Sequence, residues 1–262
     1  MKKIFSENCN LSSYTTIKVG GVAEYFAEPK SIEEFYYLIE WSNLNNQRCQ
    51  IIGAGSNLLI NNIFIKGLVI CTKKMKSLTI EPNSGIVEAE AGVMLPTLSN
   101  SLAKNGLQGG EWAVGIPGTV GGAIYMNAGT NNLSLAKNLI SVKVVNNKTH
   151  EKLEIEKKDI NFNYRFSSFQ NNDLAIISAK LYFEPNGNLQ KLIETTKNNL
   201  KLKTEKQPYH LPSFGSVFKN PKNNYAAKLI DDMGLKGFKI GGARISLMHS
   251  NFIINDSAAS SR

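Results

Sequence analysis

The chain has 262 residues, of which 42% are hydrophobic, and its formal net charge is +9. This length and composition predict a buried core in one large domain or in two or three small ones, and they exclude a disordered chain. The basic residues are scattered rather than gathered in a run, which favours a basic surface that attracts small anions over a nucleic-acid interface.

Strands and helices are predicted to alternate along the chain. A capping box at Ser31 and Glu34, followed by an apolar stripe, predicts a helix over about 31–46. A shorter helix lies between Pro96 and Gly106. Short apolar runs predict strands at residues 49–55, 67–72, 86–92, 140–145, 175–183 and 251–255.

Two more helices are predicted in the second half of the chain. The first begins after Gly187 and ends at Pro208, and its stripe at helical spacing consists of Leu189, Leu192, Ile193, Thr196 and Leu200. The second stops at Gly234 and is expected to bury Ala226, Leu229, Ile230 and Met233. A glycine-rich link, GLKGFKIGGARIS, then leads to the last strand.

The cysteines and the apolar segments indicate where the protein resides. Cys9, Cys49 and Cys71 are odd in number and widely spaced, so the sequence predicts neither a disulfide framework nor a metal site. No apolar segment approaches the length of a bilayer span, and no apolar run follows the lysines at the start. We therefore expect a soluble, cytoplasmic protein with reduced thiols and no membrane partner.

Two glycine-rich segments carry no charged side chain: GAGSNLL (residues 53–59) and VGIPGTVGGAIYMNAG (residues 114–129). The first is not a dinucleotide fingerprint, because Leu58 stands at the third glycine position, and the chain has no P-loop lysine. Each segment alone is either a tight turn or a glycine-lined junction. Together they suggest main chain converging on one large anionic ligand of the size of a dinucleotide cofactor.

Two further segments carry side chains suited to chemistry. In NYRFSSF (residues 163–169), Arg165 is either a surface residue stacked on a ring or a group that holds a carboxylate or a developing enolate. In LPSFGSVFKNP (residues 211–221), Ser216 is either a turn serine or a reactive hydroxyl, and no hydrolase triad is indicated. His210 and His249 are interpreted as ordinary hydrogen-bonding residues.

These segments, in this order, resemble the UDP-N-acetylenolpyruvoylglucosamine reductase family, flavoenzymes also called UDP-N-acetylmuramate dehydrogenases. The matching stretches span nearly the whole chain: YTTIKVGG (residues 14–21), GAGSNLL, GIPGTVGGAIYMNAG, YRFSSF, GSVFKNP and HSNFIIN (residues 249–255). The two glycine loops also resemble the wider FAD-binding fold of the vanillyl-alcohol oxidase type, so only YRFSSF and GSVFKNP select the reductase. Few residues separate Arg165 from GSVFKNP, which makes the chain similar to the shorter subgroup of the family.

The resemblance implies an α+β fold in which two α+β subdomains, residues 1–72 and 73–205, enclose non-covalent FAD. Residues 206–262 would form a C-terminal α+β substrate domain with an incomplete C-terminus. The residues implied for FAD binding are Gly53, Ala54, Gly55, Ser56, Asn57, Leu58, Gly115, Ile116, Pro117, Gly118, Thr119, Gly121 and Gly122.

The implied reaction is the NADPH-dependent reduction of the enolpyruvyl sugar nucleotide to UDP-N-acetylmuramate, in peptidoglycan precursor synthesis. Arg165 would stabilise the enolate-like charge, and Ser216 would deliver the proton. Lys219 and Asn220 would contact the substrate. We expect a monomer that binds the substrate and NADPH, without a metal or nucleic acid.

The family continues past its HSNFIIN-like strand to a segment whose Glu assists the serine, and the present sequence stops at Arg262. From the sequence we therefore expect a truncated form or a shortened paralogue, in which FAD binding is better retained than turnover. Two alternatives remain open at this point: an FAD-linked oxidase of the same fold, and a non-catalytic flavin-binding or anion-binding protein.

Overall fold

The computed structural model describes residues 4–61, 63–130 and 133–261. The first sheet has the order β1-β2-β4-β3. Its strands are β1 (Phe5–Asn10), β2 (Val22–Ala27), β3 (Cys49–Ile52) and β4 (Phe64–Cys71). The β1–β2 pair is antiparallel, whereas β2–β4 and β3–β4 are parallel. The carboxyl ends of β3 and β4 therefore lie at the same edge of the sheet, where the first glycine loop leaves β3.

Helix α1 (Ile32–Leu44) connects β2 to β3 and begins as the sequence predicts. The N–H of Glu34 donates to the Ser31 hydroxyl at 3.2 Å, and the N–H of Lys30 donates to the Glu34 carboxylate at 2.7 Å. Ser31 therefore caps one free donor of the first turn, and Glu34 holds the residue before the cap instead of the cap residue itself. The buried Phe35 and Leu38 then pack in a cluster that includes residues of the second sheet, so α1 also joins the two sheets.

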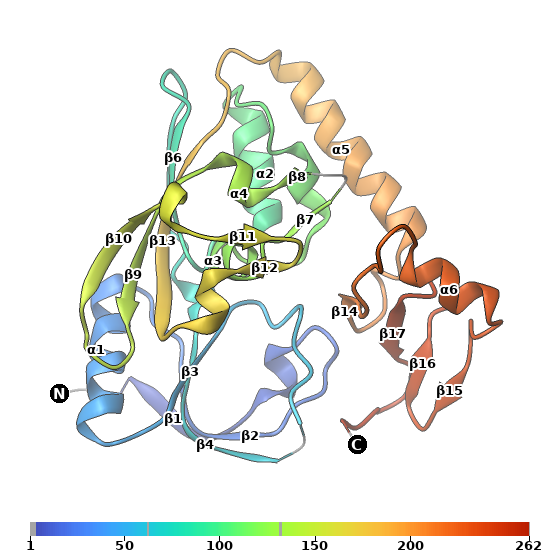
Figure 1. Ribbon diagram of the computed structural model, residues 1–262, viewed down its shortest axis with the longest axis horizontal. Helices are drawn as coiled ribbons and strands as arrows, with labels where there is room; N and C mark the ends of the chain where they lie inside the picture. The colour runs from blue at the N-terminus through green and yellow to red at the C-terminus, as the bar shows by residue number, and fades with distance from the viewer. Residues whose placement is uncertain (1–3, 62, 131–132, 262) are drawn as a thin grey trace.

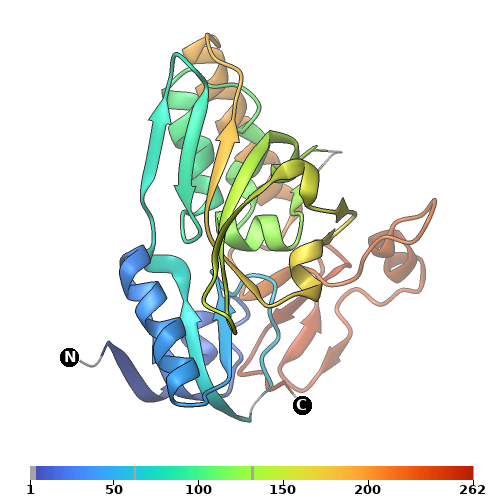
Figure 2. The ribbon, with the colours of Figure 1, turned by 60° about the vertical axis from the view of Figure 1, so that its left-hand side comes forward.

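The second sheet is antiparallel throughout, with the order β10-β9-β13-β6-β5. Its strands are β5 (Leu78–Glu81), β6 (Ile86–Glu90), β9 (Leu139–Asn146), β10 (Lys152–Glu156) and β13 (Leu174–Tyr182). Helices α2 (Leu95–Lys104), α3 (Val120–Tyr125) and α4 (Leu135–Asn138) cover it, and they share the largest buried cluster with β6, β9 and β13. Figure 2 shows this layer of helices beside the sheet.

Short elements complete this part of the chain. Two small hairpins are formed by β7 (Gly129–Thr130) with β8 (Leu133–Ser134) and by β11 (Phe162–Asn163) with β12 (Phe166–Ser167). The 3-10 helices are η1 (Leu11–Tyr14), η2 (Thr72–Lys74), η3 (Glu111–Gly115), η4 (Lys157–Asp159) and η5 (Ser168–Asn171).

The long helix α5 (Leu189–Lys206) leads from the second sheet to a third sheet, which lies to one side of the other two (Figure 1). This sheet has the order β14-β17-β16-β15, with β14 (Ser213–Ser216), β15 (Lys239–Ile240), β16 (Ala243–Ile245) and β17 (Phe252–Asn255). Helix α6 (Ala226–Asp232) accompanies it. The Asn255 amide donates to the carbonyl of Ile17 at 3.0 Å, which joins the third sheet to a loop of the first part.

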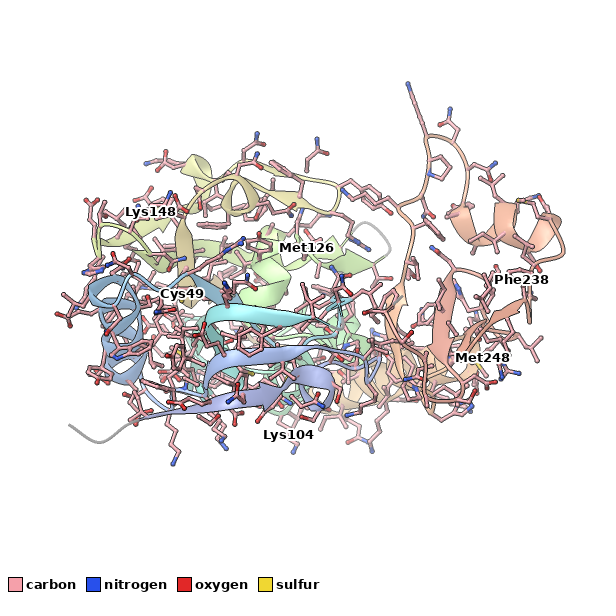
Figure 3. The ribbon with its side chains drawn as sticks, turned by 90° about the horizontal axis from the view of Figure 1, so that it is seen from below. Cys49, Lys104, Met126, Lys148, Phe238 and Met248 are labelled. Carbon is pink, nitrogen blue, oxygen red and sulfur yellow. The ribbon has the colours of Figure 1, made fainter. Side chains whose placement is uncertain are left out.

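Every predicted helix and strand is present in the structure. The sequence did not indicate β1, β2, β5, β10 or β14, and the segment interpreted as a glycine-rich link contains the β15–β16 hairpin. The predicted buried face of α6 is wrong, because the Leu229 and Met233 side chains are 42% and 71% exposed. Only Ala226 of that helix is buried, and Ile230 is half-buried. Figure 3 shows this outer region, where the exposed Phe238 and Met248 are labelled.

The predicted face of α5 is also wrong in part. Leu189 and Leu200 are exposed, whereas the positions at least partly covered by the rest of the protein run through Leu192, Thr196, Asn199 and Lys203. Within the described ranges no helix has the length and apolarity needed to span a bilayer.

Candidate functional site

A cavity of about 530 Å³ lies where the three sheets meet. The glycine loop after β3 lines one wall, and the second glycine-rich segment lines another. The Arg165 hairpin, α5 and the β14 strand complete the lining. This volume lies within the usual range for a small-molecule or cofactor site.

The first glycine loop is held close to the loop after η1. Gly55 has a φ of +64°, and a Cβ at this position would lie 2.0 Å from the carbonyl oxygen of Tyr14. Its own carbonyl accepts a hydrogen bond from the N–H of Thr16 at 3.2 Å. Both the backbone conformation and the lack of space therefore require glycine at position 55.

The two glycine-rich segments touch each other through Gly53 and Thr119. A Cβ at Gly53 would lie 2.5 Å from the Thr119 hydroxyl oxygen, which itself accepts the N–H of Gly122 at 3.2 Å. A Cβ at Gly118 would lie 3.7 Å from the Ser56 hydroxyl. The main chain of both segments therefore borders one narrow part of the cavity, as the sequence led us to expect.

The donors along this contact are free. The main-chain N–H groups of residues 54–57 and of Thr119 donate to no acceptor among the residues that the structure describes. Unpaired N–H groups from two facing loops form a concave arrangement that favours an anion such as a pyrophosphate. The residues present therefore fit the phosphates of a dinucleotide.

Arg165 is placed in the cavity by the tight turn between β11 and β12. Its backbone has a φ of +54°, a conformation that is unfavourable for a residue with a side chain. The guanidinium donates to the carbonyl oxygen of Gly129 at 2.8 Å and lies 5.1 Å from the centre of the Tyr164 ring. These contacts hold the cation at the cavity wall, while its remaining N–H groups can bind a ligand.

Ser216 reaches the same cavity because β14 contains a bulge. Ser213 pairs with Ile254 and Ser216 pairs with Phe252, so β14 uses three steps where β17 uses two. Gly215, with a φ of +79°, supplies the conformation that the extra residue requires. A bulge redirects the next side chain, and Ser216 lines the cavity.

Asn251 holds the Ser216 segment in place, a role that the sequence analysis did not assign to it. Its side-chain oxygen accepts the N–H of Phe218 at 2.9 Å, and its amide donates to the Phe218 carbonyl at 2.9 Å. Asn251 is only 4% exposed, so the amide side of this pair is buried. The sequence signal for Asn251 is its position as a polar residue directly before the apolar strand β17.

The other polar residues singled out in the sequence lie at the edge of the site or away from it. Neither Lys219 nor Asn220 lines the cavity, although the N–H of Asn220 donates to the Tyr164 hydroxyl at 3.3 Å. The His249 ring accepts the N–H of Asn251 and packs edge-on against Phe252, and burial lowers its pKa. His210 does not line the cavity, and among the described residues no cluster of His, Cys, Asp and Glu could hold a metal ion.

The sequence analysis also missed Lys203 of α5, which lines the cavity. Arg165 and Lys203 are the charged residues of this lining, and no carboxylate belongs to it among the residues described. The cavity wall is therefore cationic at these two positions and neutral along the glycine loops, an arrangement that favours an anionic ligand.

Residues 23–151 match a family model described as an FAD binding domain. This match, the α+β fold and the cavity lined by unpaired donors define the protein as an FAD-dependent oxidoreductase. Residues 207–262 match a second model, described as the C-terminal domain of UDP-N-acetylenolpyruvoylglucosamine reductase. The chain belongs to the UDP-N-acetylenolpyruvoylglucosamine reductase family, which confirms the family, fold class and enzyme class expected from the sequence.

Relatives of that name match nearly the whole chain. One from Prochlorococcus marinus subsp. pastoris is 71% identical over all of this chain and 89% of its own length. Another from Prochlorococcus marinus is 48% identical over 97% of this chain and 87% of its own length. The crystal structure of UDP-N-acetylenolpyruvylglucosamine reductase from Thermus caldophilus is 31% identical, with a TM-score of 0.83, and the match covers 98% of this chain and 91% of that one.

Replacing Gly55 by alanine tests the contact on which the first loop depends. Gly234 is the matched control, because it has a φ of +67° with no atom within 4 Å of an added Cβ. We expect Gly234→Ala to cost about 1 to 2 kcal/mol through its backbone conformation. Gly55→Ala should cost about 1 to 3 kcal/mol more through crowding and should bind less FAD. Thermal unfolding and the flavin absorbance of the purified variants measure both effects, and equal losses would contradict the close contact.

Replacing Asn251 by alanine tests the support of the Ser216 segment. We expect Asn251→Ala to lower the free energy of unfolding by about 1 to 3 kcal/mol, because two main-chain groups of Phe218 lose the buried side chain that they pair with. Asn105→Ala removes an exposed amide that donates to the Ser101 carbonyl, so it should cost no more than about 0.5 kcal/mol. Urea unfolding compares the two variants, and a similar cost would show that Asn251 does not hold the segment.

Proposed function

We propose that this protein reduces UDP-N-acetylenolpyruvoylglucosamine to UDP-N-acetylmuramate, with non-covalently bound FAD and with NADPH as co-substrate. The observation that carries the proposal is that Arg165 and Ser216, which come from different sheets, line the cavity that the two glycine loops also line. An FAD-linked oxidase would require neither residue at that place. The names of the relatives support the same substrate.

The glycine loops are proposed to hold FAD. The free N–H groups of residues 54–57 and of Thr119 would bind its phosphates, and the absence of side chains at Gly118 and Gly122 would let it lie against the main chain. Gly121 would contribute differently, because the lack of a Cβ there lets the main chain pack against Ala91. Bound there, FAD supplies hydride transfer from NADPH to the enolpyruvyl double bond.

Arg165 is proposed to stabilise the charge that develops during reduction. When a hydride adds to the outer carbon of the enolpyruvyl group, negative charge builds up on the neighbouring carbon and on its carboxylate. The guanidinium is already anchored by the Gly129 carbonyl, so it need not reorganise as this charge appears. Preorganised donors of this kind contribute several kcal/mol to transition-state stabilisation.

Ser216 is proposed to deliver the proton to that same carbon. An alcohol is a weak acid, but a carbon with enolate character is basic enough to accept its proton. The bulge at Gly215 brings the hydroxyl to the cavity, and the hydroxyl makes no hydrogen bond to any described residue. Ser216 is therefore available to donate to the substrate.

Lys219 and Asn220 are proposed to contact the substrate at the edge of the cavity. The Asn220 side-chain oxygen accepts the N–H of Ala226 at 3.1 Å, which leaves its amide N–H groups free for a ligand. Residues 1–72 and 73–205 would enclose the cofactor, and residues 206–262 would close over the sugar nucleotide. Each of these three ranges contains one of the three large sheets, and nearly all of α5 belongs to residues 73–205.

The proposed setting is a monomer in the cytoplasm that acts in peptidoglycan precursor synthesis. The three cysteines are free thiols, which fits a reducing compartment. Burial raises the pKa of Cys49 to about 12, so this thiol stays protonated and unreactive at neutral pH.

Anaerobic visible spectra test this function directly. NADPH should bleach the flavin bands of the purified protein, and the enolpyruvyl sugar nucleotide should restore them. Restoration by air but not by the sugar would instead indicate an oxidase. If flavin bands are missing even after FAD is added, the cofactor assignment is wrong.

Single substitutions separate the two proposed catalytic residues from the cofactor site. We expect Ser216→Ala to slow the sugar-dependent return of the flavin bands by about 10²- to 10⁴-fold, and Arg165→Ala to slow it by about 10²- to 10³-fold. Bleaching by NADPH should persist in the Ser216 variant. Stopped-flow absorbance measures both steps.

Ser213→Ala is the control, because Ser213 lies on the same strand but does not line the cavity. It should leave both steps nearly unchanged. A Ser216→Ala variant that returns the bands at the wild-type rate would remove Ser216 from the mechanism.

A further inference from the structure

Lys203 occupies an unusual position on α5. The helix packs against α2 and η3, and its covered positions recur every three or four residues from Leu192 through Thr196 and Asn199 to Lys203. Such positions of an amphipathic helix are normally apolar. The neighbouring Lys201 points outward instead and pairs with Glu205 at 3.9 Å. The protein therefore turns one lysine of this Lys-rich segment inward.

The stem of Lys203 is fixed against the second glycine segment. A Cβ at Gly115 would lie 2.7 Å from Cδ of Lys203 and 3.0 Å from its Cγ, so the aliphatic chain lies directly over that glycine. The carbonyl of Gly115 also accepts a hydrogen bond from the Tyr209 hydroxyl. Because Lys203 lines the cavity, this packing carries its ammonium group to the cavity wall rather than to bulk water.

The ammonium group lacks a counter-charge. Among the described residues no carboxylate pairs with Lys203 or lines the cavity. Burial, and to a smaller extent the positive charge of Arg165, lower the pKa of Lys203. A half-buried cation beside a second cation costs folding free energy, and a bound anion would remove that cost.

We propose that Lys203 and Arg165 together form an anion subsite that binds a phosphate or carboxylate group of the sugar nucleotide. The inference rests on the proposed function for the identity of the ligand, and it assigns to Lys203 a binding role that neither the sequence nor the family match indicated. The diphosphate and the carboxylate are the two groups of such a ligand that could occupy the subsite.

The experiment compares three variants of the FAD-loaded protein. Lys203→Met keeps the aliphatic stem over Gly115 but removes the charge, and Lys203→Arg keeps a charge. Lys201→Met is the matched control on the outer face. Calorimetric titration measures the affinity of each for UDP-N-acetylglucosamine, which has the diphosphate only, and for UDP-N-acetylmuramate, which has the diphosphate and the carboxylate.

We expect Lys203→Met to weaken binding by about 10- to 100-fold, as for the loss of a hydrogen bond to a charged group. Lys203→Arg should restore most of the affinity, and Lys201→Met should bind like the wild type. Weakening with both ligands would place the diphosphate in the subsite, whereas weakening with UDP-N-acetylmuramate alone would place the carboxylate there.

A stability measurement distinguishes binding from a structural role. Without a sugar nucleotide, Lys203→Met should unfold at the same temperature as the wild type or at a higher one, because an unpaired buried charge is gone. Unchanged affinity in Lys203→Met would overturn the proposal, and so would a loss of FAD without a loss of sugar-nucleotide affinity. If the wild type bound neither ligand, the proposed function itself would fail. Equal binding by the wild type and all variants would instead overturn only the subsite at Lys203.

Discussion

The contact between Gly53 and Thr119 is the constraint on which the rest of the site depends. At this point Gly53, which follows β3, and the segment that precedes α3 approach until a Cβ on Gly53 would lie 2.5 Å from the Thr119 hydroxyl oxygen. The Thr119 side chain can lie so close to the main chain of residue 53 only because that residue is glycine. The contact brings two sets of unpaired N–H donors to opposite sides of one cavity, and charged residues from other elements are then arranged around it.

Three distortions of the main chain position the polar groups of the cavity. Gly55 and Arg165 have positive φ angles, and β14 contains a bulge at Gly215 next to Ser216. None of these features belongs to a regular helix or strand. The buried clusters of the first two sheets, together with the clamp from Asn251, form a rigid frame in which such distortions persist. The regular elements supply stability, and the irregular positions direct polar groups to the cavity.

The sequence predicted most of this frame, because its signals are local. A capping box and a period of 3.6 residues identify α1. The alternation of apolar and charged residues identifies β6, and the structure shows the matching alternation of burial. The motifs also indicated the glycine loops, Arg165 and Ser216. The sequence could not show which side of a helix packs against the rest of the protein. The predicted stripe of α5 shares Leu192 and Thr196 with the covered face, but the packing against η3 covers Lys203 in place of Leu200.

Asn251 and the hairpin β15–β16 were missed for a similar reason. The partners of Asn251 lie more than thirty residues earlier in the chain, at Phe218, and no local pattern records that distance. The two short strands of the hairpin are joined by Gly241 and Gly242, and Gly234 and Gly237 precede them, so the composition of the segment indicated a link. Contacts between distant segments decide both cases, and intrinsic propensity is a weak guide where that happens.

The left-handed backbone at Arg165 has a consequence for the evolution and engineering of this protein. Glycine or asparagine would adopt that turn at lower conformational cost, so the folded chain would gain about 1 kcal/mol from losing the arginine. Selection for thermostability alone would therefore drift away from the guanidinium, and a stability-guided redesign would mark this position for replacement. With the role proposed for Arg165, function opposes that drift, and robustness and activity compete directly at this residue.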